Sequence, residues 1–149
     1  SIATAESCTG GRIGAALSSI PGASSYFVGG VVPYQTSLKT KILGVPSSLI
    51  ETHSVVSAEV ALSMAEGACR QFSSDYGLAT TGNAGPQKGD SDADVGTVYI
   101  ALVGPGVRHV EHFNFGNHRE KTIQKSVNKA LEITLKLLER KVKKHLPIH

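Results

Sequence analysis

The hydrophobic positions of this sequence change their period several times along the chain, and each change predicts a new element. Residues 1–5 form a short apolar segment that predicts a buried strand, followed by a polar, glycine-containing turn at residues 6–11. Apolar positions at helical spacing then predict a helix over residues 13–20. Residues 26–34 are apolar and rich in β-forming side chains. Gly29-Gly30 inside them predicts a bulge or a close approach between two backbones.

The central part of the chain predicts two more helices and another strand. Residues 39–43 predict a short helix. Ser57 is a good N-cap for a second helix that runs to about Phe72. Residues 76–81 are apolar and predict a strand, which leads into a small-residue loop at residues 82–86.

The last third of the chain predicts a hairpin and a long helix. The polar, acidic stretch 87–94 is an expected exposed loop, and strands are expected over residues 95–103 and 107–115 on either side of a glycine–proline turn. The helix that follows has its apolar positions along one stripe, which consists of Ile123, Val127, Ala130, Leu131, Leu135 and Leu138.

Strands that alternate with helices, with one added hairpin, predict an α/β fold: a three-layer α/β/α sandwich with a mixed sheet. We expect a single domain over residues 1–149, because neither a linker nor an internal repeat interrupts the pattern. Binding sites in such sheets lie beyond the carboxyl ends of strands. Two small-residue loops follow predicted strands, at residues 7–11 and 80–86, and they form the candidate site.

Composition narrows the class of protein. The 149 residues are 40% hydrophobic and 18% charged, as in an ordinary globular domain. No apolar run approaches the roughly 20 residues of a membrane span, so we expect no membrane partner. Cys8 and Cys69 are the only cysteines and lie far apart, so we assign neither a disulfide nor a metal site. A reducing cytoplasm is the expected location.

Basic residues gather toward the C-terminus. From Arg119 onward, Glu120, Glu132 and Glu139 are outnumbered by Arg119, Lys121, Lys125, Lys129, Lys136, Arg140, Lys141, Lys143 and Lys144. Such a helix can bind nucleic acid, but it can equally be a solvated outer face whose cations favour the helix C-terminus. Because no aromatic residue is interleaved with these charges, we favour the solvated face and expect no nucleic-acid partner.

Ser7 is the first candidate for chemistry. It lies between a predicted strand and the start of a helix, where backbone N–H groups suit an anion or a developing oxyanion. The alternative is that Ser7 or Thr9 only caps the helix, while Gly10 and Gly11 permit a tight turn. Cys8 is the stronger intrinsic nucleophile, but burial as a small hydrophobic residue is the commoner fate of a cysteine.

Tyr34 and Lys39 follow the strand that we expect beside the first one. A serine nucleophile needs a base, and a desolvated lysine can accept its proton while a tyrosine relays the proton or holds the geometry. The alternative is a surface lysine and a half-buried aromatic residue. His109 and His112 fall on opposite faces of a predicted strand, so they do not form a metal pair.

Several segments, spread over essentially the whole chain, match one family in order. They are residues 4–11 (TAESCTGG), 29–34 (GGVVPY) with Lys39 and 43–45, His53 with 56–59, 80–86 (TTGNAGP), 95–99 (VGTVY) and 115–120 (FGNHRE). Together they resemble the CinA C-terminal family, whose members hydrolyse the amide of nicotinamide mononucleotide to nicotinate mononucleotide and ammonia. Each motif alone is weak, but their common order is specific.

The resemblance implies a CinA-like fold and roles for individual residues. Ser7 would be the nucleophile, with Tyr34 and Lys39 as its activating partners. The reaction would belong to pyridine-nucleotide recycling. The nucleotide substrate would be bound by residues of both loops and by an arginine near its phosphate, namely Thr9, Gly10, Gly11, Thr81, Gly82, Asn83 and Arg119. We expect no cofactor, and a homodimer or another homo-oligomer.

The sequence departs from the family pattern in three places. Asn83 stands where an aliphatic residue is usual, and Asn117-His118 replaces the commoner continuation before the last helix. The helix that normally precedes the first strand of the family is absent, so we expect Ser1 to be an end produced by truncation or processing. In many relatives a larger domain that resembles molybdopterin-binding proteins precedes this one, and such a domain is a candidate fused partner in the full-length protein.

A function from another class stays open. The chain can instead be a non-catalytic nucleotide-binding module, or an interaction module related to competence or DNA damage, with the basic helix as its contact surface. The joint presence of Ser7, Tyr34 and Lys39 favours the enzyme. Ammonia release from the mononucleotide discriminates the two. Phosphate-ester hydrolysis lacks the carboxylate cluster that usually holds its metal.

Overall fold

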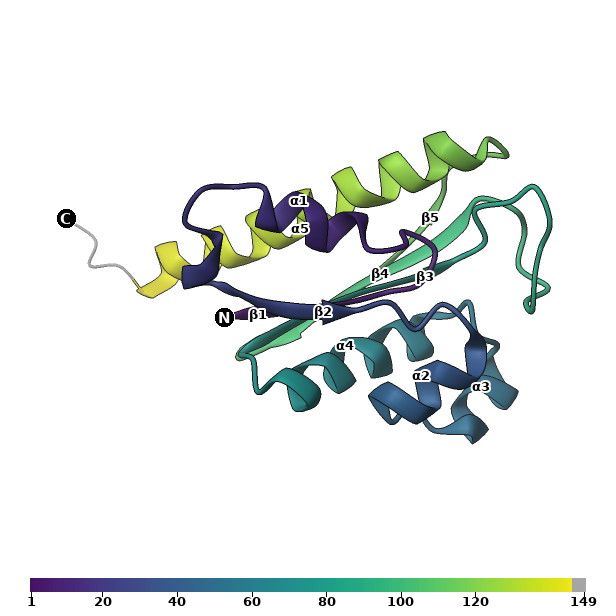
Figure 1. Cartoon of the computed structure of the whole chain (residues 1–149), viewed down its shortest axis with the longest axis horizontal. Helices are drawn as coiled ribbons and strands as arrows, with labels where there is room; N and C mark the ends of the chain where they lie inside the picture. Colours follow the sequence, from purple (N-terminus) through teal and green to yellow (C-terminus); the bar gives the residue numbers. More distant parts are fainter. Residues whose placement is uncertain (146–149) are drawn as a thin grey trace.

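A mixed sheet of five strands lies between two layers of helices in the computed structural model, which describes residues 1–145 and the side chains of residues 1–140 (Figure 1). The strands are β1 (Ile2–Glu6), β2 (Phe27–Val31), β3 (Tyr76–Gly82), β4 (Thr97–Gly104) and β5 (Val107–Asn114). Their order is β2-β1-β3-β4-β5. β1 pairs in parallel with β2 and β3, whereas β4 is antiparallel to both of its neighbours.

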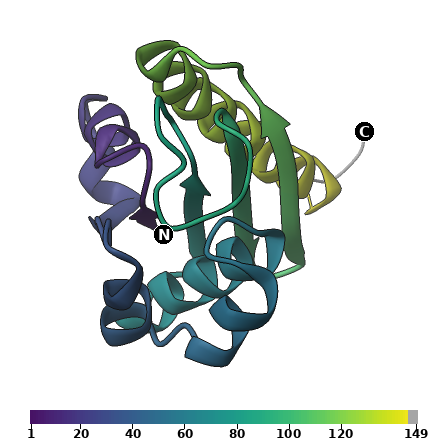
Figure 2. The ribbon, with the colours of Figure 1, turned by 90° about the vertical axis from the view of Figure 1, so that its right-hand side faces the viewer.

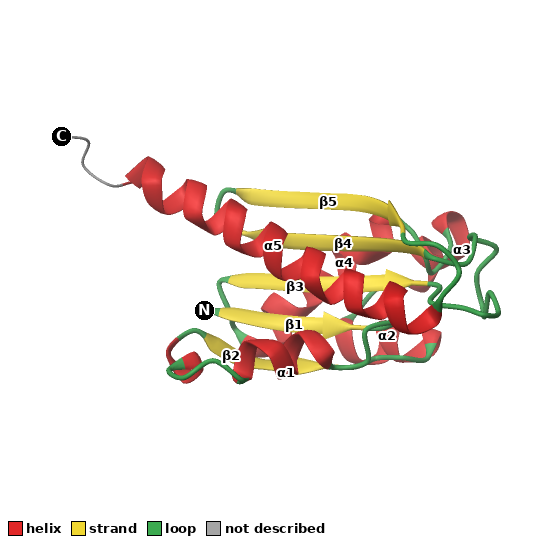
Figure 3. Ribbon diagram, turned by 90° about the horizontal axis from the view of Figure 1, so that it is seen from above, coloured by secondary structure: helices red, strands yellow, loops and turns green. Residues whose placement is uncertain are grey.

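The helices cover both faces of the sheet. α1 (Arg12–Ser18) and α5 (Arg119–His145) lie on one face, and α2 (Thr36–Leu43), α3 (Ser47–His53) and α4 (Ala58–Phe72) lie on the other (Figure 1). A short 3₁₀ turn (Ala23–Ser25) leads into β2. α5 crosses the sheet obliquely, as the view from above shows (Figure 3). The predicted three-layer sandwich with a mixed sheet is therefore confirmed.

The alternation of side chains along each strand builds one apolar core on each face. In β4, Ile100 and Leu102 pack toward α1 and α5, whereas Ala101 packs toward α4. The α4 face of the sheet is lined by small residues, so this helix packs very close to it. A Cβ added to Gly77 would lie 2.0 Å from the Ala65 carbonyl oxygen, so only glycine fits there.

Some predicted boundaries were wrong. α2 begins at Thr36 rather than at Lys39, and α3 was not predicted. β4 begins at Thr97 rather than at Val95. The apolar stripe of α5 is real, but Leu135 is 69% exposed and does not belong to the core. The basic side chains of Lys141, Lys143 and Lys144 lie outside the described residues.

The glycine pair in β2 behaves as the sequence predicted. The register between β1 and β2 shifts beside Ile2, which marks a bulge. A Cβ on Gly30 would lie 2.1 Å from the Thr4 hydroxyl oxygen, so the Thr4 side chain occupies the space beside this glycine. The predicted bulge is therefore present, and Gly30 leaves room for a side chain of the neighbouring strand.

One edge of the sheet gathers the loops that carry the candidate residues. β1, β2, β3 and β5 run in the same direction, so their carboxyl ends meet at this edge, toward which Figure 2 looks. The β1–α1 turn, the β2–α2 segment, the β3–β4 loop (residues 83–96) and the start of α5 converge there. Among the described helices, none is long and apolar enough to cross a bilayer.

Candidate functional site

Ser7 is the first residue after β1 and is held at the strand edge by its backbone. Its N–H donates to the Thr80 carbonyl oxygen at 3.1 Å, and its own carbonyl oxygen accepts from the Gly10 N–H at 3.0 Å. The turn then reverses through Gly10 and Gly11, which have φ angles of 60° and 97°. The Ser7 side chain is 8% exposed and lines a cavity at this edge of the sheet.

A buried carboxylate beneath the turn fixes its shape. Glu6 is 1% exposed, and its carboxylate accepts from the Thr9 hydroxyl at 2.7 Å and from the N–H groups of Ile13 and Gly14 at 2.8 and 2.9 Å. It thereby satisfies free N–H groups in the first turn of α1. Sequence reasoning placed Glu6 in a polar turn and missed this role. An acidic residue shortly before a helix start was the available signal.

Lys39 projects from α2 into the same cavity and reaches Ser7. Its amine donates to the Ser7 hydroxyl oxygen at 3.0 Å, to the Pro33 carbonyl oxygen at 2.8 Å and to the Tyr34 carbonyl oxygen at 3.2 Å. Only 1% of Lys39 is exposed, so this is not the surface lysine of the alternative reading. Two segments that are far apart in sequence thus place a serine hydroxyl and a lysine amine in contact.

Burial adjusts the protonation of this amine. It lowers the pKa of Lys39 from 10.5 to about 8, while nearby Cys8 and Asp90 act in the opposite sense. A neutral amine retains two N–H bonds, which the two backbone carbonyls accept. Its lone pair is then left for the Ser7 proton. The carbonyls therefore orient the amine as a base as well as binding its charged form.

Cys8 is not arranged as a competing nucleophile. It is 6% exposed, and burial raises the pKa of its thiol from 9.0 to about 12. The thiolate is the reactive form of cysteine, so at neutral pH this side chain stays a buried thiol in the cavity wall. The geometry therefore favours Ser7 over its neighbour.

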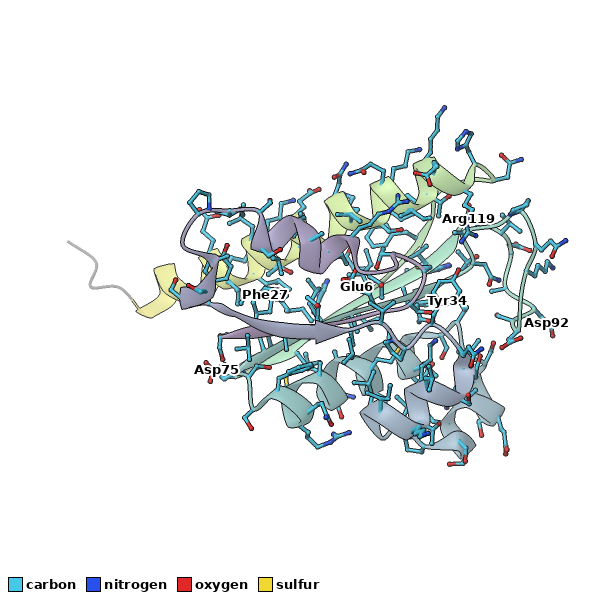
Figure 4. The ribbon with its side chains drawn as sticks, in the orientation of Figure 1. Glu6, Phe27, Tyr34, Asp75, Asp92 and Arg119 are labelled. Carbon is cyan, nitrogen blue, oxygen red and sulfur yellow. The ribbon has the colours of Figure 1, made fainter. Side chains whose placement is uncertain are left out.

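Tyr34 and Arg119 form a second pair across the cavity mouth. The Tyr34 side chain is 53% exposed, and its hydroxyl accepts from the Arg119 guanidinium at 3.0 Å. The same guanidinium donates to the Gly85 carbonyl oxygen, and Figure 4 shows both side chains at one end of the sheet. Within the described residues, the Tyr34 hydroxyl bonds to Arg119 rather than to Ser7 or Lys39. Tyr34 instead contacts Lys39 through its backbone carbonyl oxygen, which accepts a hydrogen bond from the Lys39 amine.

The cavity has a volume of about 290 Å³ and unites most of the predicted site. Its lining includes Ser7, Tyr34, Lys39, Thr81, Gly82, Asn83 and Arg119. Thr9, Gly10 and Gly11 are not part of this lining. The Thr9 hydroxyl is instead buried between Glu6 and Thr80, at 2.7 and 2.9 Å. The glycines of the first loop therefore shape the turn, and most of the loop lining of the cavity comes from the segment that follows β3.

Asn83 and its loop have a structural role that the sequence did not suggest. The Asn83 side-chain amide donates to the Ala93 carbonyl oxygen at 2.7 Å, and its backbone pairs with Gly96 and Thr97 at the base of the loop. This residue therefore closes the 83–96 loop on itself.

Charged residues of this loop also face the cavity and were missed. Lys88 and Asp90 belong to the stretch predicted as a plain exposed loop, yet both line the cavity. Lys88, Lys39 and Arg119 give the lining a cationic character that suits an anionic ligand. Among the described residues, no group of three or more His, Cys, Asp or Glu side chains is arranged to hold a metal ion.

Known proteins are similar to this chain in both sequence and fold. The profile of the CinA C-terminal domain matches residues 1–138. The chain belongs to the CinA C-terminal domain family. It is 48% identical over 135 residues to a CinA-like protein of Flavobacterium psychrophilum, covering 91% of this chain and 32% of that protein. It is 50% identical over 119 residues to a CinA-like protein of Synechococcus, covering 79% of this chain and 28% of that protein.

Solved structures of CinA proteins superpose closely on this chain. A CinA superfamily protein from Escherichia coli has a TM-score of 0.87 at 34% identity, over 91% of this chain and 79% of that one. A competence/damage-inducible protein from Agrobacterium tumefaciens has a TM-score of 0.83 at 36% identity, over 91% of this chain and 84% of that one. The predicted family and its fold are thus confirmed. The chain spans about 30% of the length of the curated CinA relatives it matches.

Proposed function

We propose that this domain is an amidase that hydrolyses the carboxamide of nicotinamide mononucleotide, giving nicotinate mononucleotide and ammonia. The observation that carries the proposal is the contact between the buried Lys39 amine and the Ser7 hydroxyl, 3.0 Å apart in the cavity at the sheet edge. A lysine pKa of about 8 leaves a usable fraction of neutral amine near physiological pH. In a solvated setting the lysine would be almost fully protonated at neutral pH and could not accept a proton, and the serine would be a weak nucleophile.

The reaction that we propose uses this pair. The Ser7 oxygen attacks the carboxamide carbon, and the neutral Lys39 amine takes the hydroxyl proton. The tetrahedral intermediate collapses by breaking the C–N bond, and the lysine ammonium gives its proton to the departing nitrogen, which leaves as ammonia. Water then attacks the ester formed on Ser7 and loses a proton to Lys39, which returns that proton to the Ser7 oxygen as the C–O bond breaks. The product leaves as the carboxylic acid and gives its remaining proton to the solvent.

The oxyanion of each intermediate needs donors from the β1–α1 turn. The N–H groups of Ser7 and Gly10 are already donated to protein carbonyls. Of the two N–H groups between them, we assign the oxyanion to that of Cys8, because Cys8 lines the cavity and Thr9 does not. Tyr34 acts in this scheme mainly by fixing Lys39 through its carbonyl oxygen and by covering the cavity mouth.

We assign the nucleotide part of the substrate to the same cavity. Arg119 and Lys88 line the cavity and supply cations that suit a phosphate, and Thr81 and Gly82, the last two residues of β3, line it as well. The Thr81 hydroxyl donates to the Val55 carbonyl oxygen at 2.9 Å, so it reaches a ligand as an acceptor or through an exchange of partners. The expected homo-oligomer and cytoplasmic location stay predictions.

Ammonia release tests the proposal directly. The purified chain is incubated with nicotinamide mononucleotide, and ammonia is measured together with the nicotinate product. Turnover by the native protein with loss in Ser7→Ala supports the amidase. Tight binding of the nucleotide without any product would instead support the non-catalytic binding module.

A further inference from the structure

Asp90 stands out among the residues that line the catalytic cavity. It is the single carboxylate in that lining within the described part of the chain, and the other charged members are Lys39, Lys88 and Arg119. It lies on the β3–β4 loop, far from Lys39 in sequence. A carboxylate is unexpected in a cavity whose other charged residues favour anions.

Asp90 is bound to the helix that carries the lysine. Its carboxylate accepts from the Thr36 hydroxyl at 2.7 Å. Thr36 is the first residue of α2, and Lys39 follows three residues later, on the same side of the helix. A carboxylate beside the first turn of a helix is also favoured by the helix dipole.

The loop holds Asp90 in place from the other side. The Asn83 side chain closes the base of the loop on Ala93. The next residue, Ser91, is 4% exposed, and its hydroxyl lies 3.1 Å from the Ser54 hydroxyl, just after α3. The contact between Asp90 and Thr36 therefore joins an anchored loop to the first turn of α2.

We propose that Asp90 is a positioning residue of this site, which holds the first turn of α2 so that the Lys39 amine stays on Ser7, and which sets the protonation of that amine through its charge. The catalytic consequence rests on the amidase function proposed above. The electrostatic consequence does not, because it concerns Lys39 alone.

The charges around Lys39 single out Asp90 as the effective anion. Burial lowers the pKa of Lys39, and the two groups that act in the opposite sense are Cys8 and Asp90. Cys8 has a pKa of about 12 and carries no charge near pH 8. The carboxylate of Asp90 is left to oppose the effect of burial, while the cations Lys88 and Arg119 line the same cavity.

Two substitutions separate the charge from the hydrogen bond. Asp90→Asn keeps an oxygen that can accept from Thr36 but removes the charge. We expect the rising limb of kcat/KM to move to lower pH by about half a unit. Thr36→Val removes the bond and keeps the charge. It should lower kcat about tenfold with the midpoint unchanged, and Thr36→Ser should restore kcat. Asp92→Asn, on the same loop (Figure 4), is the matched control and should behave as the native chain.

A second measurement does not depend on turnover. The titration of Lys39 is followed by NMR in protein with ¹³Cε-labelled lysine, and the signal is assigned by its loss in Lys39→Arg. A lower Lys39 midpoint in Asp90→Asn but not in Asp92→Asn supports the proposal. Equal midpoints in all three proteins, or equal shifts in both variants, overturn it. If Lys39 titrates as expected but no ammonia appears, the amidase function fails while the electrostatic role of Asp90 stands.

Discussion

The Lys39 amine lies 3.0 Å from the Ser7 hydroxyl oxygen, although the two residues are 32 positions apart in the sequence. The amine must be neutral to accept the serine proton, and burial lowers its pKa to about 8. We therefore expect kcat/KM for nicotinamide mononucleotide to rise with pH through a midpoint near 8. A pH-rate profile from pH 6 to 10 checks this. A flat profile over that range would exclude Lys39 as the base.

Substitutions at the pair and at its neighbour identify the nucleophile. Ser7→Ala should lower kcat by about three orders of magnitude or more while substrate affinity changes little, because the binding residues remain. Cys8→Ala should keep most of the activity, since its thiol is buried and protonated at neutral pH. Ammonia release in both variants is the measurement. The opposite pattern would transfer the chemistry to the thiol.

Lys39→Ala tests whether the two residues act as one unit. We expect a loss nearly as large as that in Ser7→Ala, because an unassisted serine is a weak nucleophile. The double variant should be no worse than the worse single variant. Losses that multiply in the double variant would show that the lysine acts at a separate step.

Much of the fold and part of the site could be predicted from the sequence. Local apolar periodicity is enough to locate β1, β3, α4 and the hairpin, since these elements bury regular faces. α3 was missed because none of its residues is buried, so its sequence carries no apolar stripe. Leu135 continues the predicted apolar stripe but is 69% exposed, whereas the neighbouring residues Ile133 and Thr134 are buried.

The site residues divide in the same way. Ser7 and Lys39 were proposed from their residue types, their places after strands and the family resemblance, but their contact depends on tertiary packing. Glu6 and Asp90 were missed because a carboxylate in a polar segment usually lies in solvent. Only the assembled structure places Glu6 under the first turn of α1 and Asp90 against Thr36.

Glu6 should be the most sensitive polar residue for stability. Glu6→Ala leaves the N–H groups of Ile13 and Gly14 without their acceptor in a buried region, and the Thr9 hydroxyl keeps only its contact with Thr80. We expect a loss of about 2–4 kcal/mol in the free energy of unfolding. Urea denaturation measures it, with the exposed Glu51→Ala as control, which should change stability by less than about 0.5 kcal/mol. Equal effects of the two substitutions would contradict the role of Glu6.

Arg119 should discriminate substrates by their phosphate. Arg119→Ala should raise KM for the mononucleotide at least about tenfold and change KM for nicotinamide riboside far less, since only the former offers a phosphate. The control is Arg12→Ala, a nearby guanidinium that pairs with Glu120 at 3.1 Å and does not line the cavity. Equal losses on both substrates would mean that Arg119 acts only by holding Tyr34 and Gly85.

Lys39 should also make the stability of the protein depend on pH, independently of any activity. Its pKa is about 8 in the folded chain against an ordinary value of 10.5, so between these values the unfolded chain binds more protons. Stability therefore rises with pH across this window, and below pH 8 the buried charge costs about 3 kcal/mol.

Lys39→Met removes that dependence but leaves the carbonyls of Pro33 and Tyr34 without a donor, which adds a loss that does not vary with pH. Urea denaturation at pH 7, 8, 9 and 10 should show the native chain gaining stability relative to Lys39→Met as the pH rises. Lys41→Met, an exposed lysine of the same helix, should follow the native curve. Parallel curves for the native chain and Lys39→Met would show that burial does not lower the pKa of Lys39.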